Sequence, residues 1–436
     1  MRRVVLILSV AMLVSQWVPA GETDSSEEGF VPLFNGENLD GWANVNCAPT
    51  TWSVRDGMIV CTGRPTGVLR TTRQYENFIL ELQWRHLVKG GNAGLFVHSY
   101  PITACGVPFT KSIEIQIMDG NHGDVFAIHG ATLKPDRPHP GGWMRALPTE
   151  KRAYPAGGEW NHYRVESRDG QISLAVNGAV VTKASACNPR KGYICLESEG
   201  SEVNFRNIRI KELPSSNPTP EVVADEDQGF HSLYNGIDLT GWRQDRGHRG
   251  HWVVQDWVLS YDGKSEAQDK NLWTEKEYKD FTFIVDWRFP GKPKPAEVPV
   301  ILHDGNYEMN PDGTQKMVTV PDAGDSGIYL RGNSKSQINI WCWPIGSGEV
   351  YGYRTDQTMP PEVRKGVTPI VKADRPLGEW NRFEITMKGD RVSVKLNEKT
   401  VLEEAQLPGV PERGPIALQH HGDPIQFANI YIKELN

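Results

Sequence analysis

Several kinds of sequence feature are absent from this 436-residue chain, and each absence excludes a class of protein. After the first twenty residues, no apolar stretch approaches the roughly 18 residues of a membrane-spanning helix. No phosphate loop, GxSxG, HExxH or strand-linked GxGxxG motif is present, so nucleotide chemistry and the common hydrolase triads have no support. Basic residues do not predominate either. The 47 Lys and Arg against 54 Asp and Glu give a net charge of −7, which disfavours a nucleic-acid partner.

Cysteine is scarce, with six residues and no Cys-x-x-Cys pair, so a cysteine zinc site is not expected. We expect most of the six to be buried free thiols, although Cys187 and Cys195 flank a short turn that a disulfide could close. What the chain has in abundance is tryptophan, glycine and proline, with 14, 43 and 30 residues. This combination is typical of a turn-rich, aromatic-rich β protein.

The first twenty residues have the layout of a secretory signal peptide. Arg2 and Arg3 form a basic start, residues 4–14 are an almost unbroken apolar run, and Val18-Pro19-Ala20 offers a small residue for cleavage. We therefore expect residues 1–20 to be removed. The mature protein is expected to be periplasmic or secreted, with no membrane span left after cleavage.

The chain also repeats itself. Residues 29–36, Gly-Phe-Val-Pro-Leu-Phe-Asn-Gly, return as Gly-Phe-His-Ser-Leu-Tyr-Asn-Gly at 229–236. Further matches follow in the same order: Trp42 with Trp242, Trp52 with Trp252, Trp84 with Trp287, 158–161 with 378–381, and 205–213 with 427–435. We predict a first domain at 29–213, a linker rich in Pro, Ser and acidic residues at 214–228, and a second domain at 229–436.

Hydrophobic periodicity indicates strands rather than helices. Short runs with a period near two predict strands at 79–84, 113–117, 163–166, 172–176 and 205–210. Long helical periodicity is absent, and Asn177-Gly178 between two apolar runs is a hairpin signal. Many short antiparallel strands over about 200 residues predict an all-β sandwich or jelly roll in each half.

These blocks resemble one known family. They are the Leu-Phe-Asn-Gly-x-x-Leu-x-Gly-Trp segment ending at Trp42, Gly-Glu-Trp-Asn at 158–161, Asn177-Gly178, and Phe-Arg-Asn-Ile at 205–208. In this order they are similar to the bacterial 3-keto-disaccharide hydrolase domain family, and the resemblance covers nearly the whole mature chain, twice. The resemblance implies two tandem concanavalin A-like, or laminin-G-like, jelly-roll β-sandwiches. It also implies cleavage of 3-keto-disaccharides or 3-keto-glycosides.

Candidate catalytic carboxyl groups lie in and after the run at 113–117. On a strand, Glu114 and Gln116 point to one face and the isoleucines beside them to the other, which leaves the polar pair on the concave face of the sandwich. Asp119 joins that face only if a bulge intervenes. Two carboxyl groups across a glycosidic bond suit acid–base chemistry, so we predict Glu114 and Asp119 as catalytic and Gln116 as substrate-binding. The alternative is a solvated polar face on an edge strand.

Two histidines are candidate general bases, because histidine titrates nearest neutral pH. His98 follows the apolar run at 94–97, and His129 lies in the Gly-rich segment just after Asp119. The alternative is that both are surface or hydrogen-bonding residues.

Three further residues are predicted to bind substrate in the first domain. Trp143 is not repeated and could stack on a sugar ring, Arg145 beside it could donate hydrogen bonds to hydroxyl groups, and Glu197 is a carboxylate. In the second copy, amides take the places of carboxylates: Gln337 aligns with Glu114, and Gln419 with Glu197. Amides keep hydrogen bonding but cannot shuttle protons. The first domain is therefore the better candidate for catalysis, and the second for sugar binding or scaffolding.

No cofactor is predicted, with Ca²⁺ the one candidate metal. Asp304-Gly305-Asn306 and residues 310–313 have an oxygen-rich composition suited to calcium. Turn chemistry alone also explains that composition.

Two functions remain open. One is an exported hydrolase of oxidised glycosides, in which a C3 ketone acidifies the C2 proton, a base such as His129 or His98 abstracts it, and the C1 aglycone leaves before hydration. A direct route would instead use Glu114 and Asp119. The other is a non-catalytic carbohydrate-binding protein with two jelly-roll faces. Both imply a carbohydrate partner.

Overall fold

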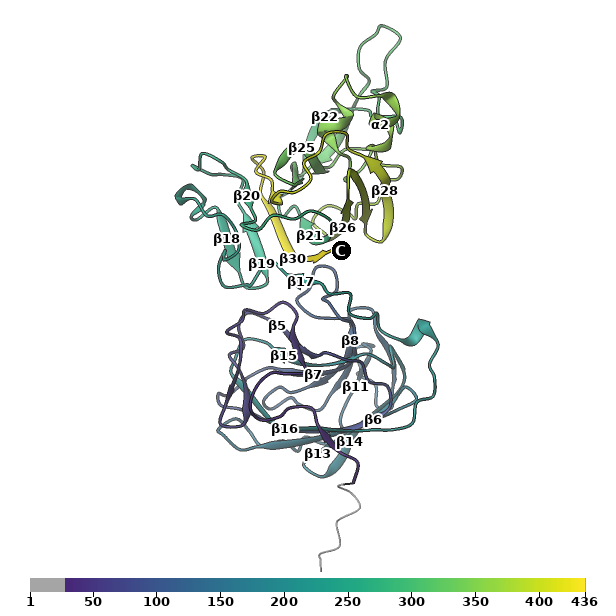
Figure 1. Ribbon diagram of the computed structural model, residues 1–436. Coiled ribbons are helices and arrows are strands. Elements are labelled where there is room, and N and C mark those ends of the chain that lie inside the picture. Colours follow the sequence, from purple (N-terminus) through teal and green to yellow (C-terminus); the bar gives the residue numbers. More distant parts are fainter. Residues whose placement is uncertain (1–27, 436) are drawn as a thin grey trace, which may run out of the picture.

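The computed structural model describes residues 28–435, which are built almost entirely of short antiparallel strands (Figure 1). Two jelly-roll β-sandwiches follow one another along the chain, and each has a larger outer sheet facing a smaller inner sheet. The predicted all-β class with two tandem jelly rolls is confirmed. The predicted signal peptide at residues 1–20 lies outside the described residues.

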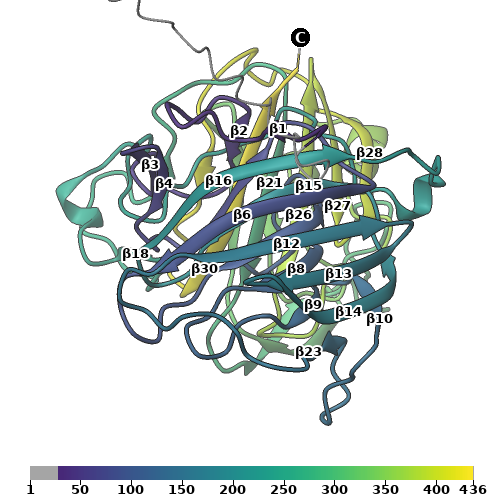
Figure 2. The same cartoon turned by 90° about the horizontal axis from the view of Figure 1, so that it is seen from below.

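The first sandwich contains strands β1 to β16. Its outer sheet runs in the order β10 (Thr132–Pro135), β14 (Ala179–Asn188), β13 (Gln171–Val176), β12 (Asn161–Arg168), β6 (Phe78–His86), β16 (Val203–Glu212), β4 (Met58–Cys61) and β3 (Trp52–Arg55), with β1 (Val31–Pro32) paired to β16. Its inner sheet runs β11 (Arg145–Ala146), β9 (Val125–Ile128), β8 (Ser112–Gln116), β7 (Gly94–Ser99), β15 (Tyr193–Ser198), β5 (Gly67–Thr71) and β2 (Trp42–Asn44). Figure 2 looks onto the outer sheet.

The second sandwich contains strands β17 to β30. Its outer sheet runs β18 (Trp252–Gln255), β19 (Val258–Tyr261), β30 (Ile425–Glu434), β21 (Phe281–Arg288), β26 (Asn381–Lys388), β27 (Arg391–Leu396) and β28 (Lys399–Gln406), with β17 (His231–Ser232) on β30. Its inner sheet runs β20 (Leu272–Trp273), β29 (Ala417–Leu418), β24 (Ser326–Leu330) and β25 (Asn333–Ile340). A separate hairpin of β22 (Lys294–Pro299) and β23 (Met317–Asp322) and two short helices, α1 (Tyr351–Arg354) and α2 (Pro361–Gly366), complete it.

Alternation along the strands produces the two cores. On β13, the apolar residues at positions 172, 174 and 176 are buried, and the residues between them are not. The repeated tryptophans Trp42, Trp52 and Trp84, with their counterparts Trp242, Trp252 and Trp287, lie in the two cores. Each copy therefore needs these rings for packing, whatever its chemistry.

The second sandwich rests with its outer sheet on the inner sheet of the first (Figure 1). Ile284 on β21 and Tyr431 on β30 pack with Val68, Phe96 and other apolar residues of the first inner sheet. Consequently every residue of β7 is buried, because one face meets the core and the other meets this interface.

A polar cluster around Asp286 holds the interface together. The segment between β7 and β8, residues 100–111, reaches the second outer sheet, where the Gly106 N–H donates to Asp286 at 2.8 Å. Arg382 donates to the same carboxylate at 2.6 and 2.9 Å, and Asn429 donates to it at 2.7 Å. Asp286 is fully buried. The charge of its carboxylate is balanced by Arg382, and the neutral donors complete its hydrogen bonds.

Two smaller observations concern the helices and the cysteines. None of the helices formed by residues 28–435 has the length and apolar character needed to cross a membrane. All six cysteines are free thiols, including Cys187 and Cys195. The expected free thiols are therefore present.

Replacing Asp286 with alanine should destabilise the protein by about 3 kcal/mol, because Arg382 and the other donors would stay largely buried without their acceptor. Urea denaturation measures this loss as a shift of the unfolding midpoint.

The control is Glu384→Ala, because Glu384 forms an exposed ion pair with Lys395 on the same outer sheet. This variant should lose less than about 1 kcal/mol. Equal losses in the two variants would contradict the role of Asp286 at the interface.

Candidate functional site

Three strands of the first inner sheet position the candidate site on its concave face. Glu114 on β8 lies opposite Phe96 on β7, and Gln116 lies opposite Gly94. On the other side of β7, the pairing of Leu196 with Leu95 brings the neighbouring Glu197 level with Gly94. Glu114 and Glu197 thus lie on the two strands that flank β7, on either side of Gly94.

Gly94 leaves the space in which the two carboxyl groups meet. A Cβ atom at this position would lie 2.8 Å from Oε2 of Glu197 and 3.1 Å from Oε1 of Glu114. Because both oxygens lie so close to one point, they are at most about 6 Å apart, so both carboxyl groups can reach one substrate. A side chain at position 94 would displace them.

Burial makes both carboxyl groups hold their protons. The pKa of Glu114 is raised from 4.5 to about 8, mainly by burial and then by the nearby charge of Glu199, while Arg145 acts in the opposite direction. The pKa of Glu197 is raised well above its usual range by burial, by Glu114 and by Glu199. Oε2 of Glu197 has no hydrogen-bond partner. The pair therefore titrates as a unit that keeps a proton at neutral pH.

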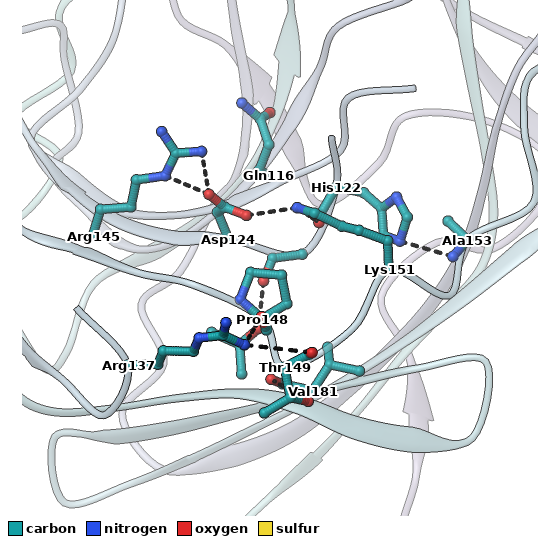
Figure 3. A network of polar contacts seen from close by, with 12 residues as sticks. Gln116, His122, Asp124, Arg137, Arg145, Pro148, Thr149, Lys151, Ala153 and Val181 are labelled. Carbon is teal, nitrogen blue, oxygen red and sulfur yellow. Dashed lines mark hydrogen bonds and ion pairs between the residues drawn. The ribbon is translucent and has the colours of Figure 1, made fainter. Parts of the chain in front are cut away.

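An ion-pair network fixes Arg145 (Figure 3), whose charge acts on Glu114. Its guanidinium group bonds to the buried carboxylate of Asp124, which Lys151 also contacts at 2.8 Å. The guanidinium group lies 4.5 Å above the ring of Phe126, the residue paired with Glu114 across β8 and β9. Arg145 is thus a fixed cation at the edge of the site.

Gln116 shares a face of β8 with Glu114, as the alternation predicted, and lies near Asp124 in Figure 3. It is half-buried, and its Oε1 atom accepts a hydrogen bond from the N–H of Ile117 at 3.1 Å. Its amide nitrogen is available to a ligand at the concave face.

Glu199 and Asn92 belong to the site although neither was predicted from the sequence. Asn92 donates a hydrogen bond to Oε2 of Glu199, and the two residues form an isolated β-bridge just beyond β7 and β15. Burial raises the pKa of Glu199. The signal that could have found Glu199 is its spacing from Glu197, since residues two apart on a strand share a face.

The structure does not bring Asp119 to Glu114. The strand β8 ends at Gln116, and Asp119 lies beyond it, where its carboxylate accepts hydrogen bonds from the N–H groups of Gly90 at 2.8 Å and Ala156 at 2.9 Å. These bonds lower its pKa and join two loops. The carboxyl partner of Glu114 is Glu197, which sequence reasoning had assigned to substrate binding.

Neither candidate histidine lies at the carboxyl pair. His98 is fully buried, its Nε2 atom lies 3.1 Å from the hydroxyl of Ser167, and burial lowers its pKa to about 4. His129 is exposed after β9 and stacks on Phe109. Its neighbour Ile128 pairs with Ser112, at the opposite end of β8 from Gln116.

Trp143 lies at the rim of the site. The residue is 61% exposed, and its ring stacks on His139 with ring centroids 4.6 Å apart. The guanidinium group of Arg145 lies 6.0 Å from the Trp143 ring. Both residues can therefore reach a ligand that extends outward from Glu114.

The second sandwich has amides where the first has the carboxyl pair. Gln337 pairs with Tyr329 as Glu114 pairs with Phe96, and its Nε2 atom donates to Gln419 at 2.7 Å. The amides satisfy each other, whereas two carboxyl groups at these places must share protons.

Acidic groups of the second sandwich lie at other positions. The pKa of Asp325, just before β24, is raised to about 8 by burial and by Asp423 and Asp322. Glu349 is buried and forms an ion pair with Arg354 at 2.7 Å. Asp325 therefore has to be included in any test of which sandwich is catalytic.

The calcium candidates have ordinary turn contacts. Asp304 accepts the N–H of Asn306 at 2.9 Å, and Asp312 accepts the N–H of Thr314 at 2.9 Å. Within residues 28–435, no group of three or more His, Cys, Asp or Glu side chains is arranged to hold a metal ion.

The raised pKa of Glu114 predicts a pH-dependent stability. The folded state binds more protons than the unfolded state between pH 4.5 and about 8, so wild-type stability should fall as pH rises through this window. Glu114→Gln cannot titrate, so its stability relative to the wild type should increase by about 1.4 kcal/mol per pH unit.

Urea denaturation of both proteins at pH 4.5 and pH 8 checks this. Glu166→Gln on the outer sheet is the control for replacing a glutamate with a glutamine away from the site. A stability difference between Glu114→Gln and the wild type that stays constant with pH would contradict the buried, protonated carboxyl.

Both sandwiches have known relatives. Residues 29–211 and 229–433 match the 3-keto-alpha-glucoside-1,2-lyase-like domain family. A 3-keto-disaccharide hydrolase of Bacteroides thetaiotaomicron is 24% identical over 262 residues, which cover 47% of this chain and 87% of that protein.

Two solved structures are also similar. One, from Parabacteroides distasonis, carries a provisional description as a glycosyl hydrolase; it is 24% identical with a TM-score of 0.36, over 44% of this chain and 98% of that one. The other is a beta-glucanase of Bacillus licheniformis, 14% identical with a TM-score of 0.29, over 42% of this chain and 97% of that one. The family match spans most of the chain and confirms the resemblance seen in the sequence. This chain belongs to the 3-keto-alpha-glucoside-1,2-lyase-like domain family, with one copy of the domain in each sandwich.

Proposed function

We propose that this protein cleaves the glycosidic bond of 3-keto-glycosides, 3-keto-disaccharides among them, and that the first sandwich is catalytic. The observation that carries the proposal is the pair of buried carboxyl groups, Glu114 and Glu197, that meet over Gly94. Perturbed pKa values of this kind are typical of groups that transfer protons. The layout of residues 1–20 supports a periplasmic or secreted place of action.

Elimination followed by hydration suits this pair. A ketone at C3 acidifies the C2 proton, which Glu114 accepts as the general base. The electron pair of the C2–H bond passes into an enolate with the C3 ketone. As the C3 carbonyl re-forms, the C1=C2 double bond forms, the bond from C1 to the aglycone oxygen breaks, and Glu197 donates its proton to that oxygen. Water then adds at C1 and a proton returns to C2, so the net reaction is hydrolysis.

Burial assigns the two roles. Glu197 is 1% exposed and has the stronger tendency to stay protonated, which suits the acid. Glu114 is half-buried and lies beside Arg145, whose charge favours the ionised form, which suits the base. The C2 proton and the aglycone oxygen sit on adjacent sugar carbons, and oxygens no more than about 6 Å apart can reach both.

Arg145 is placed to stabilise the charge that develops on the substrate. Its bonds to Asp124 fix its position, and Figure 3 shows one guanidinium nitrogen directed away from that carboxylate. A positioned cation stabilises the enolate formed when the C2 proton leaves.

Glu114→Gln and Glu197→Gln should each lower kcat on a 3-keto-glucoside by at least about a hundredfold, because an amide cannot transfer the proton. In the wild type, kcat/KM should rise with pH up to about 8, where Glu114 loses its proton. Product release followed over a pH series measures both effects.

Two further variants make this test specific. Glu166→Gln makes the same chemical change on the outer sheet of the first sandwich and should leave kcat unchanged. Asp325→Asn tests the acidic group of the second sandwich. Turnover lost in Asp325→Asn but kept in Glu114→Gln would place catalysis in the second sandwich. Absence of turnover in every protein, with sugar binding retained, would favour a carbohydrate-binding protein instead.

A further inference from the structure

The second sandwich has an open cleft on its own concave face. The cleft has a volume of about 650 Å³ and is lined by Asp245, Gln268, Asp269, Lys270, Asn271, Tyr329 and His420. The Glu114 site lies in the other sandwich, so this cleft is a separate feature.

The cleft occupies the region that is covered in the first sandwich. The strand pairings place Tyr329 where the first sandwich has Phe96, and Trp273 where it has Arg70. Phe96 and Arg70 are buried, and Phe96 packs in the apolar cluster with Ile284 of the second sandwich. In the second sandwich, Tyr329 lines the cleft although most of its side chain is buried, and the half-buried Trp273 packs beside it.

The polar groups of the cleft are fixed before any ligand arrives. Asp269 accepts a hydrogen bond from the indole N–H of Trp273 at 2.7 Å and from the N–H of Asn271 at 3.0 Å. The side-chain Oδ1 atom of Asn271 in turn accepts the backbone N–H of His420 at 3.0 Å. The ring of Trp273 stands against Tyr329, with centroids 5.8 Å apart. An oriented carboxylate therefore lies beside a pair of rings.

We propose that this cleft is a second saccharide-binding site, which takes a neutral pyranoside. Rings offer an apolar surface to the C–H face of a pyranose, and the carboxylate and amide of Asp269 and Asn271 suit sugar hydroxyl groups. Lys270 and Asp245 bring charges of both signs to the lining, so a strongly charged ligand is not selected.

Among the described residues, the cleft has no carboxyl pair like that of the first sandwich. The amides Gln337 and Gln419 replace the carboxyl pair of the first sandwich and bond to each other on this same inner sheet. The site therefore holds sugar on the protein while the first sandwich acts, and its ligand class does not depend on the chemistry proposed there.

Titration calorimetry of the full chain with maltose and with cellobiose tests the site. All titrations use the Glu114→Gln protein, so that turnover at the first sandwich plays no part. At least one disaccharide should bind saturably, with one equivalent per chain. Adding Asp269→Ala or Trp273→Ala should weaken that binding by about tenfold or more, because each removes the oriented carboxylate or the ring.

Two control variants distinguish loss of the binding site from loss of the folded structure. Trp160→Ala removes a half-buried tryptophan of the first sandwich that lies over Arg206, and the affinity should not change. Trp273→Phe keeps a ring and loses only the indole donor to Asp269, so it should retain more affinity than Trp273→Ala.

Three outcomes would overturn the proposal. They are no saturable binding of either disaccharide, binding that survives Asp269→Ala and Trp273→Ala unchanged, and binding that only Arg145→Ala abolishes. A failed turnover assay would leave these outcomes unaffected, since none of them requires the first sandwich to be catalytic.

Discussion

The missing side chain at Gly94 is the constraint on which the candidate active site depends. Glu114 and Glu197 come from strands on either side of β7, and their carboxyl groups meet only because the strand between them carries no Cβ atom at that place. The inner sheet lies under the second sandwich, so water is partly excluded from the site. Burial then opposes ionisation of both groups. Proximity and desolvation together give the pair its proton chemistry.

The two sandwiches show what the fold requires and what it does not. Both keep a glycine at this place, and a Cβ atom at Gly327 would lie 2.6 Å from the Gln337 side chain. The amides there bond to each other and need no shared proton. The shared scaffold thus supports a proton-transferring pair in one copy and a hydrogen-bonded pair in the other.

Sequence reasoning predicted the fold and part of the site. The period of two identified the face of Glu114 and Gln116, and the repeat identified the amides that replace the carboxyl groups. It could not predict where β8 ends, which decides that Asp119 binds loop N–H groups instead. The closeness of Glu197 to Glu114 depends on the order of strands in the sheet, which local sequence patterns do not predict. The interface around Asp286 joins segments far apart in the chain and left no local signal.

The most direct measurement is the isotope effect on kcat/KM for a 3-keto-glucoside deuterated at C2. It is measured in the wild type and in Glu114→Asp. The shorter aspartate keeps a carboxylate but holds it farther from the C2 proton, so proton removal becomes the step that limits the rate. If Glu114 removes the C2 proton while Glu197 protonates the aglycone oxygen, the effect should be clearly above one and larger in Glu114→Asp. An effect of one in both proteins would contradict this mechanism.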